Sequence, residues 1–414
     1  MSPASGRRIL LVAPFMALPE EVGYNRFVDL ARRLTRRGHR VTLLTSRFSH
    51  FRKAVRASTA GQDDPALAGV DLRLIHEPGY RRNVGVTRAA SHAIFLQCLR
   101  RFLAGLAPDY DLVYAAMPLV GSAAIAGRWA RRKGMRFVVD IQDPWPEAQA
   151  FALPGPTPLW RGVLAPAEGV ARRTYARADA VFGVSESFLR PARRAVAPDA
   201  PVRSIYLGTD TGAFLARPAR GASPATQGLQ LVYIGTLGTS YDFETVFQAL
   251  AQWQEAQGAT PHLTLYGDGP RRRELEARAD AAGLPVTFRG TVPQPRLAEE
   301  LAAYDLAINP YYPGALQSVT NKLADYLAAG LPVINAANNA EVVSLLAEWQ
   351  AGQSYPPGDA DGLRRLLAAL AEAPGELDGM SEQARALALR HFDRDRIYLP
   401  LDELAQFGIT EEEV

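Results

Sequence analysis

The sequence predicts an α/β protein built from two Rossmann-like domains, with parallel sheets that face each other across a cleft. Short apolar runs alternate with helical periodicities along nearly the whole chain, which is typical of parallel sheets covered by helices. In the second half these runs end in loops rich in Gly, Pro or Asp. A segment rich in Pro, Gly, Ser and Ala, residues 216–228, separates the two halves and has the composition of a linker.

The composition fits a protein that folds around sizeable cores. Of 414 residues, 48% are hydrophobic and 21% are charged, and the length allows two or three domains. The single cysteine, Cys98, excludes a disulfide framework and a Cys-based zinc site. The start of the chain runs into a strand and lacks a secretory signal. We therefore expect a cytoplasmic protein, either free or bound peripherally at the inner face of the cytoplasmic membrane.

The formal net charge of +3 hides a strong asymmetry. Residues 1–205 hold 31 Lys and Arg against 16 Asp and Glu, a balance of +15; residues 206–414 hold 15 against 27, a balance of −12. The basic half predicts an anionic partner, such as a membrane surface, a phosphate-bearing acceptor or nucleic acid. No RNA-binding aromatic signature or helix-turn-helix pattern supports nucleic acid. Solvated arginines in an Arg-rich composition are the alternative explanation.

The first predicted domain covers residues 1–207. Strand Arg8–Val12, a loop ending near Gly23, helix Tyr24–Arg37 and strand Arg40–Thr45 have the length of a Rossmann half. No G-x-G-x-x-G sequence follows the first strand, so the dinucleotide fingerprint is absent. A long polar segment, residues 47–68, comes next. Its candidates for contact with an anionic acceptor are His50, Arg52 and Lys53.

The loop DIQDPWPEAQ follows an apolar strand, Phe137–Ile141. In open parallel sheets, ligands bind at the carboxyl ends of the strands. We therefore predict Asp143 and Glu147 as catalytic carboxylates, and Asp140 and Trp145 as acceptor-binding residues. Ordinary capping of a strand end is the alternative reading of such Asp and Pro residues.

The second predicted domain covers residues 208–390. Its strands begin with Gln230–Ile234, and the loop after that strand contains Gly235 and Gly238. These glycines allow backbone N–H groups to approach a phosphate closely. Strands at His262–Tyr266, Val286–Phe288 and Leu306–Asn309 follow and should end at the same edge of a parallel sheet.

The run from Gln317 to Asn335 is the most informative stretch. A helix is predicted from Asn321 to Ala329, and Pro332 prevents it from continuing. Lys322, at its start, is one of only three lysines and the only one in the C-terminal half. A compact ammonium beside free backbone N–H groups suits a phosphate. A solvated surface lysine is the alternative.

Taken in order, these motifs resemble the retaining glycosyltransferases of family 4, which have the GT-B fold. The resemblance rests on YIGTLG, YGDGP, FRGTVP and NKLADYLAAGLPVI, and it covers nearly the whole chain. DIQDPWPE is similar to a loop of bacterial members that build surface polysaccharides. The resemblance implies a nucleotide-sugar donor, usually a UDP-sugar, no metal or other cofactor, and a final segment, residues 391–414, with a helix that crosses back to the first domain.

The family also implies roles for single residues. The base would lie near Thr291 and Val292, the diphosphate near the 235–238 loop and Lys322, and the ribose near Asp325. The predicted donor-binding residues are Gly23, Arg26, Gly235, Thr236, Leu237, Gly238, Asp268, Thr291, Val292, Gln317, Ser318, Thr320, Asn321 and Asp325.

Two features depart from the family pattern. Gln317 and Asp325 stand where the family has a pair of glutamates, and the loop after strand Gln230–Ile234 holds no cation. Stabilisation of the leaving diphosphate therefore rests more heavily on Lys322, which we count among the catalytic residues, and on Arg26.

The expected activity is transfer of a sugar to an acceptor hydroxyl with retention, in bacterial exopolysaccharide, capsule or O-antigen assembly. The basic first domain suggests a lipid-diphosphate-linked saccharide as acceptor and a peripheral membrane contact. A nucleotide-sugar epimerase of GT-B fold is one alternative, although the six histidines offer no strong acid/base candidate. A non-catalytic scaffold of a polysaccharide-assembly complex is another, and nucleic-acid binding ranks last.

Overall fold

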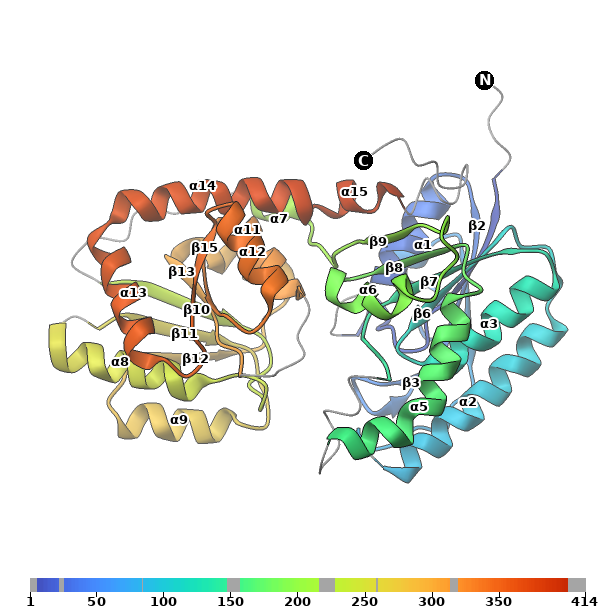
Figure 1. Cartoon of the computed structure of the whole chain (residues 1–414), viewed down its shortest axis with the longest axis horizontal. Helices are drawn as coiled ribbons and strands as arrows, with labels where there is room; N and C mark the ends of the chain where they lie inside the picture. The colour runs from blue at the N-terminus through green and yellow to red at the C-terminus, as the bar shows by residue number, and fades with distance from the viewer. Residues whose placement is uncertain are drawn as a thin grey trace, which may run out of the picture. The chain divides into compact units, whose positions relative to one another are not determined.

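The computed structural model describes residues 6–21, 26–83, 85–146, 157–215, 228–257, 260–312 and 319–400. Contacts within the chain divide it into two compact units (Figure 1). Unit 1 runs from the N-terminus to Ile205 and includes the chain from Tyr398 on, and unit 2 runs from Tyr206 to Ile397. Among the described residues, no helix is long and apolar enough to cross a membrane.

Unit 1 is built on a parallel sheet of seven strands in the order β5-β2-β1-β6-β7-β8-β9. The inner strands, such as β6 and β8, are buried on both faces because helices cover the sheet, which explains why they appear in the sequence as continuous apolar runs; the edge strands β5 and β9 are partly exposed. They are β1 (Arg8–Val12), β2 (Arg40–Ser46), β5 (Val70–Ile75), β6 (Leu112–Met117), β7 (Arg136–Ile141), β8 (Ala180–Gly183) and β9 (Val202–Ser204).

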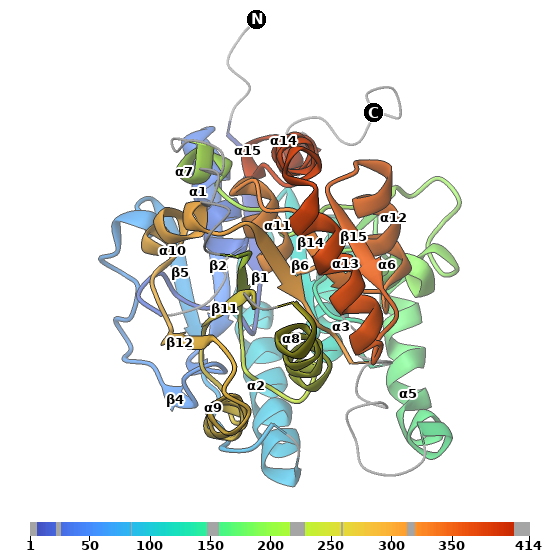
Figure 2. The same cartoon turned by 90° about the vertical axis from the view of Figure 1, so that its left-hand side faces the viewer.

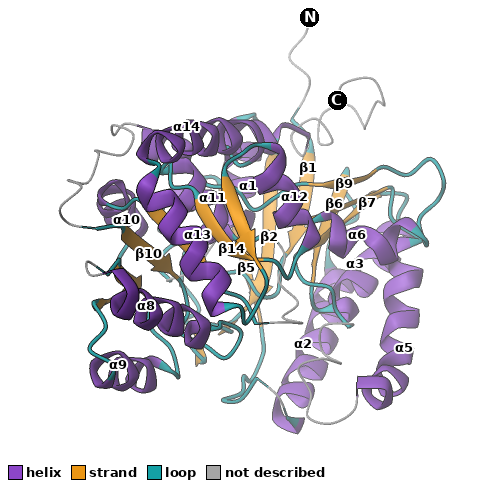
Figure 3. Cartoon of the chain, turned by 60° about the vertical axis from the view of Figure 1, so that its left-hand side comes forward, coloured by secondary structure: helices purple, strands orange, loops and turns teal. Residues whose placement is uncertain are grey.

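The helices of unit 1 lie in the connections between these strands. α2, α3 and α5 are neighbours and form one layer, in which α3 packs against both others (Figure 3). The helices are α1 (Arg26–Arg36), α2 (Val86–Gly105), α3 (Val120–Arg132), α5 (Thr157–Tyr175) and α6 (Glu186–Arg193).

The polar segment after β2 forms a small antiparallel hairpin of β3 (Phe48–Ser49) and β4 (Ala54–Val55), and a 3₁₀ turn, η1 (Pro65–Leu67), follows it. Arg56 anchors this hairpin. Its buried guanidinium donates hydrogen bonds to the Glu21 carboxylate and to the carbonyls of Ser46 and Met16. The hairpin is thus tied to the loops after β1 and β2.

Unit 2 has a parallel six-stranded sheet in the order β12-β11-β10-β13-β14-β15. Chain order reverses between β10 and β13, as at the switch point of a Rossmann sheet. The strands are β10 (Gln230–Ile234), β11 (His262–Tyr266), β12 (Val286–Gly290), β13 (Leu306–Asn309), β14 (Val333–Ala336) and β15 (Gly352–Tyr355).

Helices cover both faces of this second sheet, and α8 and α13 lie side by side on one of them (Figure 2). The elements are α7 (Thr211–Leu215), α8 (Phe243–Gln257), α9 (Arg272–Ala281), α10 (Gln294–Glu300), η2 (Leu301–Ala303), α11 (Asn321–Ala328), α12 (Ala340–Glu348), α13 (Ala360–Glu372), α14 (Pro374–His391) and α15 (Arg394–Ile397). α14 packs on α11, where Ser381 donates a hydrogen bond of 2.6 Å to the Gly330 carbonyl.

The predicted α/β class is confirmed in both units. Strands β10, β11 and β13 have the predicted bounds, and α11 begins at Asn321 as expected. The predicted linker, residues 216–228, lies outside the described residues except for Gly228. The chain returns to unit 1 at Tyr398, whose buried ring packs under the Arg26 guanidinium at 5.0 Å.

Candidate active site

The loops after β10, β11 and β12 are joined by backbone hydrogen bonds at the carboxyl edge of the second sheet. Gly235 N–H donates to the Tyr266 carbonyl at 2.9 Å, and Gly267 N–H donates to the Gly290 carbonyl at 2.8 Å. Gly267 has a φ of +134°, and a Cβ there would lie 1.9 Å from the Gly235 carbonyl oxygen. Only glycine permits this close approach, which fixes the floor of the predicted donor site.

Lys322 lies at the start of α11, beside this floor. Its side chain is buried, with a relative exposure of 8% for the residue, so the surface-lysine alternative is wrong. Three tyrosine rings surround the ammonium, with centroids at 4.4 Å for Tyr233, 3.8 Å for Tyr241 and 5.2 Å for Tyr311. Lys322 Nζ also donates to Tyr233 Oη at 3.3 Å. We call these four side chains the tyrosine cage.

Within the part of the chain that the structure describes, the cage gives the Lys322 ammonium no charged partner. Burial lowers the pKa of Lys322 well below its usual range, and no charged group of the described residues contributes to that shift. Contacts with the electron-rich faces of aromatic rings stabilise a buried cation in part. A bound anion would supply the missing counter-charge. The ideal Cβ position of Gly235 lies 3.4 Å from Lys322 Nζ, so the glycine loop and the ammonium border the same space.

The cage is built where the sheet reverses its order. Tyr233 belongs to β10, Tyr241 follows it, and Tyr311 follows β13; an isolated antiparallel bridge joins Tyr241 to Tyr311. Tyr326 fixes the helix, because its buried Oη accepts a hydrogen bond of 2.7 Å from the N–H of Ile234, at the end of β10. Ligands of Rossmann sheets bind at this switch point.

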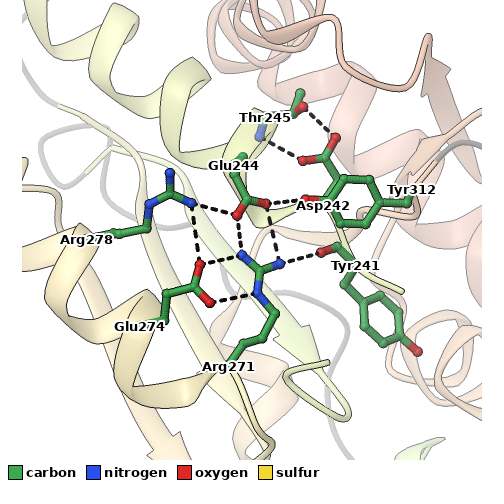
Figure 4. A network of polar contacts seen from close by, with 8 residues as sticks. All are labelled: Tyr241, Asp242, Glu244, Thr245, Arg271, Glu274, Arg278 and Tyr312. Atoms are coloured by element: carbon green, nitrogen blue, oxygen red, sulfur yellow. Dashed lines mark hydrogen bonds and ion pairs between the residues drawn. The ribbon is translucent and has the colours of Figure 1, made fainter. Parts of the chain in front are cut away.

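A network of charged residues supports the loop that carries Tyr241 (Figure 4). Arg271 pairs with Glu244 and Glu274, and its Nη1 donates to the Tyr241 carbonyl at 3.3 Å. Glu244 also accepts from Arg278 and from Tyr312 Oη, at 2.6 Å and 2.7 Å. Partial burial opposes ionisation of Glu244, but the bonds from Arg271 and Tyr312 outweigh it and lower its pKa to about 2.

Two expectations about the donor loop need correction. Leu237 was predicted to bind the donor, but its side chain is fully buried and its N–H donates to the Asp268 carbonyl, so it supports the loop from within. The N–H of Gly235 was expected to face a phosphate, but it donates its hydrogen bond to the Tyr266 carbonyl. The start of α8 does not suit a phosphate either. Its N–H groups are capped by the carboxylate of Asp242, which accepts a hydrogen bond from Thr245 N–H at 3.1 Å.

Other predicted donor residues lie at the carboxyl edge or on α11. Thr236, Asp268 and Thr291 are exposed, and Gly238 and Val292 are half-buried. On the α11 side, Thr320 Oγ1 lies 3.3 Å from Tyr311 Oη, and Asn321 Oδ1 is buried and has no hydrogen-bond partner among the described residues. Asp325 is half-buried, one turn after Lys322. Gln317 and Ser318 lie outside the described residues.

In unit 1 the loops after the strands gather aromatic and histidine rings. Phe15, after β1, stacks on His50 at 5.1 Å and lies 5.3 Å from His92 and 6.3 Å from Trp145. Tyr80, after β5, places its Oη 2.5 Å from His50 Nδ1. We call these five residues the ring cluster. Trp145 and His50, both predicted to bind the acceptor, are thus brought together.

Two cations lie against the ring cluster. Lys53 lies over Tyr80 at 4.8 Å, and Arg88 lies over Tyr80 at 5.5 Å and Trp145 at 4.9 Å. Lys53 Nζ donates to Asn83 Oδ1 at 2.5 Å, and Lys53 has a φ of +55°, which is uncommon outside glycine. Arg88 Nε is buried without a hydrogen-bond partner. Among the described residues, no carboxylate forms an ion pair with either cation.

The surroundings of the ring cluster also shift the pKa values of the groups in and beside it. Burial, helped by the charges of Lys53 and Arg88, lowers the pKa of His50 and of His92 to about 4, so both are neutral at pH 7. Asp143 is exposed as a residue, but neighbouring atoms crowd its carboxyl group and desolvate it. This desolvation raises the pKa of Asp143 to about 6, and the charge of Arg88 offsets part of the rise. Asp143 therefore has an acid/base range near neutrality. Its predicted companion, Glu147, lies outside the described residues.

Arg26 and Asp140 do not fit their predicted ligand roles. Arg26 Nε donates to Asp140 Oδ2 at 2.8 Å, and the two side chains are 1% and 0% exposed. Asp140 also accepts from Tyr114 Oη and Gln142 Nε2, each at 2.7 Å. Both side chains are buried inside unit 1 and bind each other, so neither is exposed to a ligand. Arg52 is exposed on the hairpin, and Gly23 lies outside the described residues.

Sequence reasoning missed most of the aromatic residues in both sites. Tyr241, Tyr311, Phe15 and Tyr80 all lie in loops that follow strands of the two parallel sheets. An aromatic residue in a loop at the carboxyl end of a strand is the sequence feature that could have predicted these contacts. Arg88 gave none, because it lies in the first turn of a helix.

Two family models match consecutive parts of the chain. Residues 24–208 match "Glycosyl transferase 4-like domain", and residues 228–373 match "Glycosyl transferases group 1". The chain belongs to family 4 of the glycosyltransferases. It is therefore a nucleotide-sugar-dependent glycosyltransferase of a retaining family. No curated protein matches the chain by sequence.

Solved structures of the GT-B fold cover nearly the whole chain at low identity. HepE from Anabaena, solved with UDP and glucose, has a TM-score of 0.66 at 16% identity, covering 97% of this chain and 100% of that one. WaaG, a glycosyltransferase involved in lipopolysaccharide biosynthesis, gives 0.65 at 17%, with 97% and 100% covered. Sucrose-phosphate synthase from Thermosynechococcus elongatus gives 0.66 at 18%, with 96% and 98% covered. These similarities establish the two-domain GT-B fold.

Proposed function

We propose that this enzyme transfers a sugar from a UDP-sugar to the hydroxyl of a phosphate-bearing saccharide acceptor, with retention, in the assembly of a bacterial surface polysaccharide. The buried ammonium of Lys322, which the described residues leave without a charged partner, is the observation that supports the donor half of the proposal most directly. HepE, of the same fold, is described with UDP and with UDP-glucose. WaaG is described as acting in lipopolysaccharide biosynthesis.

In this proposal the diphosphate binds between the Gly235 loop and the first turn of α11. Lys322 supplies positive charge to the leaving diphosphate, and the unpartnered Asn321 Oδ1 accepts from a hydroxyl of the donor. Charge that is fixed in a dry site stabilises a developing anion far better than charge in water. Asp325, one turn further along the helix, is assigned to the ribose, while Thr291 and Val292 are assigned to the base.

The acceptor is assigned to the ring cluster of unit 1. Flat aromatic faces such as Trp145 and Phe15 suit the apolar faces of a sugar ring, and Lys53 and Arg88 suit an attached phosphate. Asp143 is assigned as the carboxylate that orients the attacking hydroxyl, because its pKa of about 6 allows it to accept a proton near neutral pH. Arg52 is a further candidate contact for the acceptor.

The proposal also states that no metal ion is needed, because Lys322 provides the charge that a cation would otherwise bring to the diphosphate. A thermal-shift screen against UDP, GDP, ADP, CMP and dTDP, each with and without magnesium, tests these statements together. We expect a selective shift with UDP that magnesium does not change. A shift with another nucleotide would refute the UDP assignment, and a shift only with magnesium would refute metal independence.

Product analysis separates the transferase from its alternatives. Incubation with the donor alone should leave the sugar configuration unchanged, whereas an epimerase would convert it. With a lipid-diphosphate-linked saccharide present, we expect release of UDP and a lengthened saccharide. Binding of UDP without any turnover over a panel of donors and acceptors would favour the scaffold reading.

A further inference from the structure

Helix α2 is apolar on the face that it turns to solvent. Its buried stripe consists of Ser91, His92, Phe95, Leu99 and Leu103, on the side that packs on α3. The opposite side is exposed and is mostly apolar, with Val86, Ala89, Ala90, Ala93 and Ile94; Thr87 and Gln97 are its uncharged polar residues. Val86 is 85% exposed and Ile94 is 38% exposed. A surface helix of a globular domain normally presents a polar face to water.

The surroundings of this exposed face are strongly basic. Between Pro78 and Pro108 the chain holds five arginines, Arg81, Arg82, Arg88, Arg100 and Arg101, and no acidic residue. Arg81 and Arg82 precede the exposed apolar stripe, and Arg100 and Arg101 follow it on the same helix. All four are exposed. Basic side chains thus lie at both ends of an apolar strip.

The β3–β4 hairpin, which is held near the start of α2, carries two further exposed apolar residues. Phe51 and Val55 are each 54% exposed, and Arg52 between them is exposed as well. The hairpin is fixed beside the start of α2, because Lys53 binds Asn83 and the Phe48 ring packs 5.0 Å from Tyr80. Figure 1 shows β3 beside one end of α2. We call the exposed apolar residues and the exposed arginines together the basic–apolar strip. It consists of Phe51, Val55, Val86 and Ile94 with Arg52, Arg81, Arg82, Arg100 and Arg101.

We propose that the basic–apolar strip docks unit 1 on the surface of an anionic lipid bilayer. A helix with exposed apolar residues and flanking arginines lies in the plane of the interface, with its apolar side chains below the headgroups and its guanidinium groups among the phosphates. A second copy of the chain fits less well, because a two-fold contact through the strip would bring like charges together.

Docking at this strip has a consequence for the acceptor, and this consequence rests on the proposed function. Phe51 contacts His50 of the ring cluster, with ring centroids 5.7 Å apart. Lys53 and Arg88 lie against the ring cluster, and both come from the segments that carry the strip, Lys53 from the hairpin and Arg88 from α2. A phosphate at the level of the lipid headgroups would therefore reach the two cations directly, which deepens the acceptor assignment to a saccharide whose phosphate is anchored in the bilayer.

Co-sedimentation of the full chain with vesicles tests the docking. We expect binding to phosphatidylcholine vesicles that contain phosphatidylglycerol and little binding to pure phosphatidylcholine. The variant Arg81→Gln/Arg82→Gln should bind about 25-fold more weakly, since each basic residue near such a surface contributes about fivefold. Val86→Ser/Ile94→Ser should weaken binding about tenfold or more through lost insertion. Both pairs are exposed, so folding should be unaffected.

Leu389→Ser is the matched control, because Leu389 is 40% exposed on α14 of unit 2 and should not alter binding. Equal binding by all variants, equal binding to both vesicle types, or a dimer that the Val86→Ser/Ile94→Ser change dissociates would each overturn the proposal. The UDP-induced thermal shift, measured on the same preparations, reports the donor site separately. A lost shift with intact vesicle binding would count against the proposed function alone.

Discussion

Replacing Lys322 by methionine removes the charge at the centre of the tyrosine cage and keeps most of the volume of the side chain. The methionine can pack on the three rings that now face the ammonium. It leaves no unpaired buried cation, so we expect the free protein to be no less stable than the wild type. The effect should appear only when a nucleotide diphosphate is bound.

The size of the effect follows from the contact that is lost. A hydrogen bond to a charged group contributes about 1.5–3 kcal/mol, which corresponds to a loss of about 12- to 160-fold in affinity. At a UDP concentration of about 100 times the wild-type dissociation constant, the wild type gains about 2.7 kcal/mol of stability. The variant at the same concentration should gain only about 0.3–1.3 kcal/mol.

Differential scanning fluorimetry over a UDP titration measures this difference. Lys133→Met is the matched control, because Lys133 is an exposed lysine at the end of α3 in unit 1. It should give the full UDP-induced shift. If Lys322→Met retains the same UDP affinity as Lys133→Met, the assignment of the diphosphate to the cage is refuted, whatever the activity of either variant.

Three further predictions concern unit 1. Arg26→Met should lower the free energy of unfolding by about 3–5 kcal/mol in urea denaturation, because it leaves Asp140 buried without its cation, and Arg26→Met/Asp140→Leu should recover much of this; a single variant as stable as the wild type would contradict the structural role. Burial lowers the folded-state pKa of His92 to about 4 while the unfolded value stays near 6.5, so the contribution of His92 to stability should be complete above about pH 6.5 and fall by up to about 3 kcal/mol as the pH drops to about 4; the melting temperature of His92→Gln should fall less over this range. If ionised Asp143 orients the acceptor hydroxyl, kcat/KM should rise with pH through about 6, where its raised pKa lies, and this limb should be missing in Asp143→Asn.

The sequence was sufficient to predict the sheets, because strands that are buried on both faces are continuous apolar runs separated by helical periodicities. Strands β10, β11 and β13 show this most clearly, since each is a run of four or five residues bounded by turn residues. Lys322 could be singled out because lysine is so rare in this chain. These features depend on local composition, which a single sequence displays.

Features that depend on pairing between distant residues could not be predicted. Arg26 and Asp140 are 114 positions apart, and nothing in either segment shows that their charges meet inside the unit. In helix α2 apolar residues lie on all sides, so the sequence alone could not distinguish the buried face from the exposed one. Likewise, the three rings of the cage come from separate loops that only the strand order brings together.

The lowered pKa of Lys322 links donor binding to the uptake of protons. Burial lowers the pKa of Lys322, and a bound polyanion would raise it again, so binding should take up protons from the buffer wherever the pH lies between the pKa of the free and of the bound protein. Calorimetric enthalpies measured in buffers of different ionisation enthalpy would then differ by the fraction of a proton absorbed. The same coupling makes donor affinity decrease as the solution becomes more alkaline, so the cage makes nucleotide capture sensitive to the acidity of its surroundings.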